Sequence, residues 1–367
     1  MHRIFHSIGH GVWMTLNLLA VTLLLAADLA GLVPPTKLQL PALLAIGFEV
    51  LALVNAVFAV SWLFSSHKSW CIVSILALLC SSAQLRATFS FSSSHISGDL
   101  PKGQRGLTIL TYNTHLLQNN TPVDQNELLR YIHDSGADIV CMQEYAVYKD
   151  AHYPTFGQVK NALADTYPYT YFDFSVHNRR LQYGLAVYSK YPLTDKTTIP
   201  LNTKGNGANY CDVVVRSDTF RLFNNHLQSN SLQSSEIDSL LAITTRTTSK
   251  LLSAFAARTA QVEAVRAAID ASPYPVIVCG DFNDVPASYA YRRLSKGLQD
   301  AFRTTSFLRT GHTYVRSSAL PWFHNATFGP GIRIDYILTD PMLRATDFRI
   351  DRVAYSDHYP VMAAFTW

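Results

Sequence analysis

The sequence is poor in charged residues, and the shortage is confined to one end. Only 15% of its 367 residues are Asp, Glu, Lys or Arg, whereas soluble domains usually carry about 25%. Residues 1–100 hold four basic and three acidic residues, which leaves 30 − 4 = 26 basic and 26 − 3 = 23 acidic residues for the rest. The rest therefore resembles an ordinary globular domain. Without a strong basic surplus it is not typical of avid, nonspecific DNA-binding proteins, although nucleic acid is not excluded.

Metal-binding and disulfide patterns of cysteine are also missing. There are five cysteines, with no CxxC and no Cys/His ligand spacing, so neither a zinc site nor a disulfide framework is indicated. We interpret all five as small buried hydrophobic residues, namely Cys71, Cys80, Cys141, Cys211 and Cys279. No internal repeat or low-complexity block is present, which argues against a solenoid.

What the N-terminus has instead is three apolar stretches, at about 12–33, 42–64 and 70–89. Each has roughly the 20 residues that a helix needs to cross a bilayer. A cleaved signal peptide is the rival interpretation of the first stretch, but the run is too long for a signal core and two more follow. We therefore predict a membrane anchor over residues 1–90 with three transmembrane helices.

The orientation of this anchor follows from weak signals. Three spans place the two termini on opposite sides of the membrane, and Arg3 and Lys68 favour a cytoplasmic N-terminus, although Lys37 and Arg86 lie on the other side. The C-terminal domain would then face outward. Polar residues in the spans raise the alternative of a transporter or channel, but no pore motif accompanies them and we assign them to helix packing.

Residues 91–105 are rich in Ser, Gly and Lys and read as a linker. Residues 106–367 then alternate β-rich runs with a few helical patterns. Strands are expected at 107–112, 137–142, 185–188, 213–215, 220–224, 274–279, 334–338 and 361–365, and helices at 124–134 and 254–269. Many strands with few, scattered helices predict two sheets packed face to face with helices outside.

Polar side chains recur where these β-rich runs begin or end. In chain order they are Asn113, Glu144, His226, Asp281, Asn283, Asp335, Asp357 and His358. Each one alone is more often a turn or a cap, but the ordered set is hard to obtain by accident. Carboxylate and amide oxygens suit Mg²⁺ or Mn²⁺, and an acid–His pair is suited to charge stabilisation and proton transfer beside a phosphate. The set therefore indicates metal-dependent phosphoester hydrolysis.

These stretches together resemble the endonuclease/exonuclease/phosphatase superfamily of deoxyribonuclease-like phosphoesterases. The resemblance covers about residues 107–367 and is carried by TYNTHLL (111–117), DIVCMQE (138–144), YGLAVYSKYP (183–192), NNHLQS (224–229), CGDFND (279–284), RIDYIL (333–338) and SDHYPV (356–361). It implies an α+β fold, a four-layer αββα sandwich with two mostly antiparallel sheets. The N-terminal spans also resemble the anchor of a membrane-attached bacterial subgroup, which implies an inner-membrane protein with its catalytic domain outside the cytoplasm.

The resemblance also implies a role for each residue of the set. Glu144, Asn113 and Asp357 would hold the divalent cation, Mg²⁺ or Mn²⁺. Asp281 would align or deprotonate the attacking water, and Asp335 would orient the imidazole of His358. The groups that contact the phosphate would then be Asn283, His226 and His358.

Two further phosphate contacts, Tyr183 and Arg258, are weaker inferences from the same resemblance. An insertion at 230–258 and a loop at 311–331 carrying Trp322, Phe323 and Phe328 depart from the better-known members of the superfamily. Both are expected to shape substrate choice, so nucleic acid, phospholipid and small phosphoesters all stay open. The alternative is a membrane-anchored binding module that keeps the fold without catalysis, but no key ligand is missing. No obligate protein partner is indicated.

Overall fold

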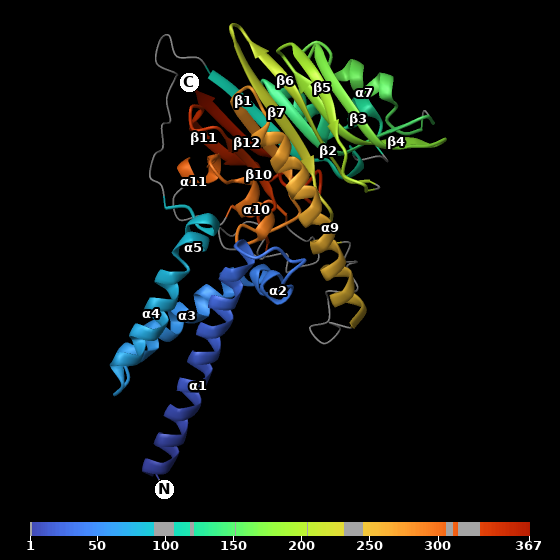
Figure 1. Ribbon diagram of the computed structural model, residues 1–367. Helices are drawn as coiled ribbons and strands as arrows, with labels where there is room; N and C mark the ends of the chain where they lie inside the picture. Colours follow the sequence, from blue (N-terminus) through green and yellow to red (C-terminus); the bar gives the residue numbers. More distant parts are fainter. Residues whose placement is uncertain are drawn as a thin grey trace. The chain divides into compact units, whose positions relative to one another are not determined.

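The computed structural model describes residues 2–91, 106–117, 121–150, 152–203, 205–230, 245–305, 311–314 and 331–367. Most of the predicted linker and nearly all of the loop at 311–331 lie outside these residues. The chain forms two compact units, shown in Figure 1. The first contains Met1–Phe89 and Asp284–Arg292, and the second contains Ser90–Asn283 and Arg293–Trp367.

The N-terminal unit is helical, but only its first helix is long and apolar enough to cross a membrane unaided, over His10–Gly31. Its elements are α1 (His2–Asp28), η1 (Leu29–Gly31), α2 (Leu40–Ile46), α3 (Phe48–Leu63), η2 (Lys68–Trp70), α4 (Cys71–Cys80) and α5 (Ser82–Thr88). The second and third predicted spans are each a bent pair of helices, with angles of 76° and 63°. The prediction of three continuous transmembrane helices is therefore supported for the first alone.

The breaks have local causes. Between α2 and α3 the chain leaves helical geometry at Gly47, with φ −95° and ψ 14°. Glycine destabilises a helix interior because it loses the most backbone freedom. Between α4 and α5 the break falls at Ser81, whose hydroxyl donates to the Ala77 carbonyl and to Asp28 Oδ2. Such back-bonding by serine bends helices.

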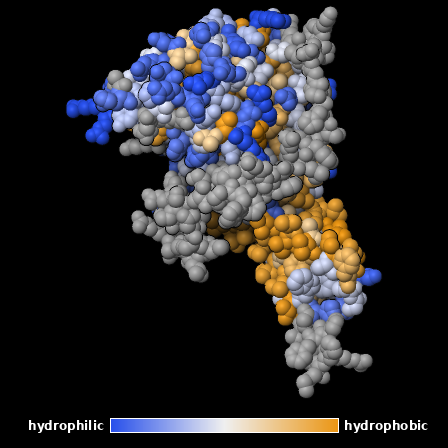
Figure 2. All heavy atoms as spheres, turned by 180° about the vertical axis from the view of Figure 1, so that it is seen from behind, coloured by the Kyte–Doolittle hydropathy of each residue, from blue (hydrophilic) through white to orange (hydrophobic). Residues whose placement is uncertain are grey.

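This unit has an apolar surface and a few polar side chains buried among apolar ones. Large exposed side chains include Leu40, Val50, Leu53 and Leu79, and Figure 2 shows the helical unit covered by hydrophobic residues. Inside, the fully buried Asn17 donates to Ser74 Oγ at 2.6 Å and accepts from Trp62 Nε1 at 2.9 Å. This distribution is expected of helices that face lipid and associate through polar contacts.

The second unit is a sandwich of two six-stranded sheets (Figure 1). The first sheet has the order β11 (Arg344–Ile350), β12 (Val361–Thr366), β1 (Gly106–Asn113), β2 (Ile139–Tyr148), β4 (Leu181–Ser189), β3 (Tyr169–His177). The second has the order β5 (Leu193–Ile199), β6 (Gly207–Val215), β7 (Asp218–His226), β8 (Val276–Asp281), β10 (Asp335–Thr339), β9 (Gln299–Asp300).

Both sheets are mixed, with one parallel pair each among the described strands. The parallel pairs are β1–β2 and β7–β8, and the other paired strands run antiparallel. Helices of this unit flank the sheets: η3 (His115–Leu117), η4 (Val123–Gln125), α6 (Glu127–Asp134), α7 (Phe156–Ala162), α9 (Thr245–Asp270) and α11 (Ala301–Thr305). A further helix, α10 (Tyr289–Leu294), belongs mostly to the first unit. The predicted α+β sandwich of two mostly antiparallel sheets flanked by helices is confirmed.

Strand alternation builds the core on both faces of the first sheet. Along β1, Leu107 and Ile109 point between the sheets, where they join Cys211 and Ile277 of the second sheet. The intervening residues, such as Leu110, point to the opposite face and pack beneath α6 and α7. Because successive strand residues point to opposite faces, β1, which is buried at most positions, can serve two layers of packing.

Candidate active site

Strand register alone brings three of the polar residues together in the second sheet. His226 ends β7 and pairs with Asp281 at the end of the parallel strand β8. Asp335 begins β10 and pairs with the same Asp281 from the other side. Residues paired across neighbouring strands lie about 5 Å apart, so Asp281 sits between a histidine and a second acid. From the first sheet, Asn113 at the end of β1 and Glu144 in β2 complete this edge of the sandwich.

Glu144 reaches the site because β2 is irregular there. The register of β2 against β4 shifts between Met142 and Tyr145, and Glu144 has a left-handed backbone with φ 50°. Met142 and Tyr145 both pack on the outer face of the sheet, whereas strict alternation would have placed 142 and 144 there. A bulge re-aims one side chain in this way. Thr114 holds the bulge, since its amide and its hydroxyl both donate to the Gln143 carbonyl.

A buried pair of amides lies directly behind the site and joins the two sheets. Gln143 Nε2 in β2 donates to Asn224 Oδ1 in β7 at 2.7 Å, and Asn224 Nδ2 donates to the carbonyls of Met142 and Ala186 at 3.2 Å. Both amides are fully buried. Gln143 precedes Glu144, so this pair fixes the spacing of the sheets at the site. Neither Gln143 nor Asn224 was predicted as a site residue, although they lie in the stretches DIVCMQE (138–144) and NNHLQS (224–229).

Asp281 is held by three donors. Its Oδ1 accepts from the Asn283 amide at 2.7 Å, and its Oδ2 accepts from the side-chain amides of Asn113 and Asn283 at 3.0 and 3.1 Å. Asn283 takes a left-handed φ of 53° to do this. The preceding Gly280 has φ 126°, and a β-carbon there would overlap the backbone of Asn225. Glycine is therefore required where β7 and β8 approach each other.

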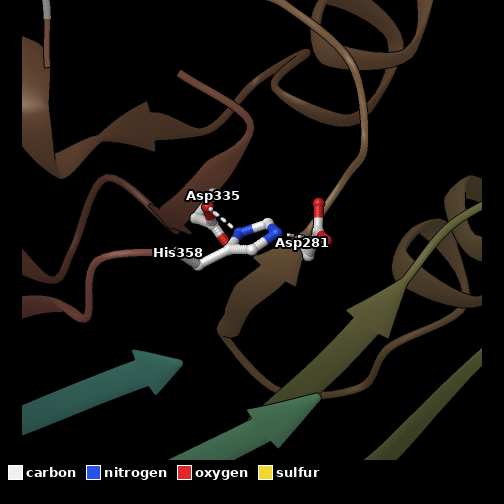
Figure 3. A group of neighbouring side chains, drawn as sticks. All are labelled: Asp281, Asp335 and His358. Carbon is white, nitrogen blue, oxygen red and sulfur yellow. Dashed lines mark hydrogen bonds and ion pairs between the residues drawn. The ribbon is translucent and has the colours of Figure 1, made fainter. Parts of the chain in front are cut away.

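Asp335, His358 and Asp281 form a chain through the imidazole, shown in Figure 3. His358 Nδ1 lies 2.9 Å from Asp335 Oδ2, and Nε2 lies 3.7 Å from Asp281 Oδ2. All three residues are buried. Burial lowers the pKa of His358, but the two carboxylates outweigh it and raise that pKa to about 10. The ring is therefore an imidazolium at neutral pH.

The other two ionisable groups of this centre shift in different ways. Burial raises the pKa of the Asp281 carboxyl to about 7, with Asp335 adding to the effect and His358 opposing it. Burial also lowers the pKa of His226, against the attraction of Glu144. At neutral pH the site therefore combines a cationic His358 with a neutral His226 and an acid poised near its own pKa. Such separated values are typical of acid–base centres.

Glu144 forms a second half of the site. Its Oε1 accepts from Asn113 Nδ2 at 3.3 Å and lies 3.6 Å from His226 Nε2. Its Oε2 lies 3.7 Å from Nδ1 of His115, which is also 3.4 Å from Asp357 Oδ1. His115 was not among the predicted site residues, although it stands two residues after Asn113 in the same stretch.

This half has the donors that a hard divalent cation requires. In the described part of the chain no Lys or Arg forms an ion pair or hydrogen bond with Glu144, Asp357 or Asp281. Acids gathered without a Lys or Arg partner among the described residues, beside an amide, make an oxygen-rich set that suits Mg²⁺ or Mn²⁺. The tightest group of potential ligands among the described residues is instead Asp281, Asp335 and His358, within 4.8 Å of one another. We interpret that trio as a proton-carrying chain, because Asp335 occupies one nitrogen of a protonated ring.

The two weaker candidates occupy different places. Tyr183 in β4 is part-buried, and the charges of Glu144 and Asp281 add to burial in raising the pKa of its hydroxyl, so it faces the site. Arg258 in α9 is buried, and it donates to the Gln228 carbonyl and to Asn230 Oδ1 at 2.7 Å. It thus fastens the segment after β7. Within the insertion, residues 231–244 lie outside the described residues.

The chain was compared with known families and proteins. The endonuclease/exonuclease/phosphatase family model matches residues 110–358. A second model, a domain of unknown function called DUF8431, matches residues 10–88. It carries no assigned function, so the membrane-attached subgroup stays a prediction. No curated protein matches the sequence.

Solved structures share the fold at low sequence identity. An endonuclease/exonuclease/phosphatase protein from Beutenbergia cavernae has 18% identity and a TM-score of 0.53, over 71% of this chain and 72% of that one. Truncated TDP2 from Caenorhabditis elegans has 18% identity and a TM-score of 0.51, over 71% and 98%. D. rerio TDP2 has 17% identity and a TM-score of 0.51, over the same shares. The family match spans more than half of the chain, and the protein belongs to the endonuclease/exonuclease/phosphatase family.

Proposed function

We propose that this protein is a membrane-tethered, divalent-cation-dependent hydrolase of phosphodiester bonds. The observation that carries the proposal is the Asp335–His358–Asp281 chain, in which a buried imidazolium lies 3.7 Å from an acid whose pKa is raised to about 7. An acid with a pKa near neutrality can accept a proton from water under working conditions. A permanent cation beside it stabilises the charge that develops on a phosphate.

The residues divide the work between them. Asp281 accepts the proton of the attacking water, and the amides that hold its carboxylate keep it aimed. His358 faces the scissile phosphate as a cation, with Asp335 orienting its ring. The neutral His226 donates a hydrogen bond to a phosphate oxygen, and the Tyr183 hydroxyl does the same. Asn283 binds the phosphate by exchanging the bond that its side-chain amide donates to the Leu227 carbonyl. Glu144, Asn113 and Asp357 would hold Mg²⁺ or Mn²⁺, which supplies Lewis-acid stabilisation of charge on the phosphate.

Charge favours a diester over a monoester. A phosphate monoester is close to a dianion at neutral pH and is usually recognised by Arg or Lys. Among the described residues, the ion pairs and hydrogen bonds of the Asp281, His226 and His358 side chains are with acids, histidines and amides. A singly charged diester needs less compensation, which the cation and His358 can provide.

The substrate is either nucleic acid or a phospholipid or small phosphodiester. D. rerio TDP2, which shares the fold, was solved with a single-strand DNA product, which supports the first. An apolar helix long enough to cross a membrane favours the second, because it would hold the catalytic unit near lipid. Both classes contain the same scissile bond.

A substrate panel on the full-length protein in detergent tests the proposal. It compares plasmid DNA, oligonucleotides, sphingomyelin, phosphoinositides and a chromogenic diester with its monoester, each with Mg²⁺ or Mn²⁺. We expect diester hydrolysis that needs the cation, and a shift to higher cation concentration in Glu144→Gln. Glu127→Gln, an exposed glutamate in α6, is the matched control. No turnover of any diester, or identical cation dependence in both variants, would refute the assignment.

The tether has a test of its own. We propose a multi-pass anchor in a bacterial inner membrane with the catalytic unit outside the cytoplasm, on the strength of the helix at His10–Gly31 and the two bent pairs. Alkaline phosphatase fused after Trp367 should be active in cells, because its disulfides form only after export. An inactive but expressed fusion would place the catalytic unit in the cytoplasm.

A further inference from the structure

His115 occupies a backbone conformation that is costly for its residue type. It begins a run of three residues with left-handed φ values, 40° at His115, 66° at Leu116 and 56° at Leu117. Each such residue costs roughly 1–2 kcal/mol when it is not glycine, so the run persists only because its surroundings enforce it. Two contacts hold the run in place. The His115 amide donates to Asn113 Oδ1 at 3.2 Å, and the carbonyl of the buried Leu117 accepts from Asn126 Nδ2 at 2.8 Å.

The result of this turn is a histidine side chain held between two acids. The ring is 58% exposed, yet its Nδ1 lies 3.4 Å from Asp357 Oδ1 and 3.7 Å from Glu144 Oε2. The two acids come from distant parts of the chain, the bulge of β2 and the segment before β12. If β1 continued straight, residue 115 would lie beyond the end of the sheet. The left-handed turn instead keeps the His115 ring beside the sheet's end, near Glu144 and Asp357.

We infer that His115 is a nitrogen ligand of the divalent cation, together with Glu144, Asn113 and Asp357. This inference rests on the cation site of the proposed function. Ligands about 2.1 Å from an octahedral ion lie about 3.0 Å apart when adjacent and about 4.2 Å apart when opposite. The separations from Nδ1, 3.4 Å to Asp357 Oδ1 and 3.7 Å to Glu144 Oε2, are about 0.4 and 0.7 Å wider than that of adjacent ligands, so a small side-chain rotation brings each acid into an adjacent position. The side-chain oxygen of Asn113 accepts a hydrogen bond from the His115 backbone amide, which links Asn113 to the other three residues.

A nitrogen ligand changes which cation the site prefers. Mg²⁺ selects oxygen donors, whereas imidazole adds affinity for transition metals, of which Mn²⁺ also accepts carboxylates. We therefore expect Mn²⁺ to bind more tightly than Mg²⁺, and we expect that preference to depend on His115. The alternative role of His115 is a surface ion pair with the two acids, which contributes little at such exposure.

Pulsed electron paramagnetic resonance of Mn²⁺ bound to the full-length protein in detergent tests the inference without measuring turnover. The wild-type protein should show modulation from a directly bound imidazole nitrogen. His115→Asn should lose it and should bind Mn²⁺ about tenfold more weakly, with little change for Mg²⁺. Asparagine is the suitable replacement because it tolerates left-handed backbone, and a thermal melt confirms folding. His115→Gln gives a second variant of similar reach.

His133→Gln is the matched control. His133 lies 2.7 Å from Asp134 and 3.4 Å from Asp165, so it also sits between two acids, but it belongs to α6. Its loss should leave Mn²⁺ binding and the nitrogen signal unchanged. If Mn²⁺ binds in a Glu144-dependent manner and the nitrogen signal persists in both His115 variants, the inference is wrong and the proposed function stands. If the wild-type protein binds no Mn²⁺ through Glu144, both are wrong.

Discussion

The two units of this protein bury polar side chains in opposite ways. In the N-terminal helices the buried polar residues are neutral, and most of their hydrogen bonds pair them with one another or with backbone, as Asn17 pairs with Ser74 and Trp62. In the sandwich they include charged groups that share partners, as Asp281 and Asp335 share His358. Neutral pairs hold helices together, whereas shared charges shift pKa values and create reactivity.

Burial alone does not distinguish the polar residues that pack helices from those of the catalytic set. Asn17 and Asp281 are equally buried. What distinguishes the catalytic set is its excess of acids over bases and its backbone strain, since His115, Glu144 and Asn283 all take left-handed φ values. Strain of this kind tends to collect at functional sites. The described helical unit has no non-glycine residue with positive φ.

The strongest test of the contrast removes the charge that reactivity needs. Asp281→Asn keeps the shape of the side chain but cannot accept the proton of water, so turnover should fall about 10²–10⁴-fold. The melting temperature should change little, because an asparagine oxygen can still accept the Asn283 amide. Asp347→Asn, an exposed residue of β11, is the control. Wild-type turnover in Asp281→Asn would show that the chain of charges is not catalytic.

The next test asks whether charge in the sandwich also serves packing. Arg333 and Asp300 form an ion pair at 2.8 Å with both side chains 1% exposed, and Arg333 also stacks over Phe302 and Tyr336. Arg333→Met should cost about 3–5 kcal/mol of unfolding free energy, because it leaves a carboxylate buried without its partner. Chemical denaturation measures the loss. Adding Asp300→Asn should recover much of it, and an equal loss in single and double variants would exclude charge as the cause.

The pH profile measures the two shifted groups directly. Asp281 must be deprotonated, so kcat/KM should rise about tenfold per pH unit up to its pKa of about 7. His358 must stay protonated, so activity should hold until pH approaches about 10 and then fall. Asp335→Asn removes the carboxylate that most raises the pKa of His358, and should move the alkaline limb toward neutral pH. A profile that falls between pH 6 and 8 would contradict both assignments.

The sequence predicted the interior of each sheet and missed its borders. The eight predicted strands correspond to β1, β2, β4, β6, β7, β8, β10 and β12, which all lie between two neighbours. The four that were missed are β3, β5, β9 and β11, the edge strands. Interior strands such as β1, β7 and β8 are buried at most positions, whereas β5 and β3 are largely exposed or part-buried. Edge strands carry polar residues to avoid aggregation, which removes the pattern that identifies them.

The site was predictable where a side chain follows a regular strand. Asn113, His226 and Asp281 end strands whose register is set by continuous apolar runs, and the structure brings them together. The position of His115 was not predictable. Left-handed backbone is usually signalled by glycine, and the three left-handed residues here are His115, Leu116 and Leu117. The amide pair Gln143–Asn224 was missed for a different reason: its partners are 81 residues apart, and only the packing of the sheets brings them together.

The smallest expected effect comes from removing a neutral buried group of the N-terminal helices. Asn17→Leu deletes two hydrogen bonds between helices, and such bonds contribute about 0.6 kcal/mol each on average in helices that face lipid. The melting temperature in detergent should drop by a few degrees, while phosphodiester turnover stays within about twofold of wild type because no charge is disturbed. Thr22→Val is the control, since its hydroxyl bonds only to Leu18 of the same helix at 2.8 Å. An Asn17→Leu protein that melts like the wild type but loses turnover would mean that a neutral buried group carries chemistry after all.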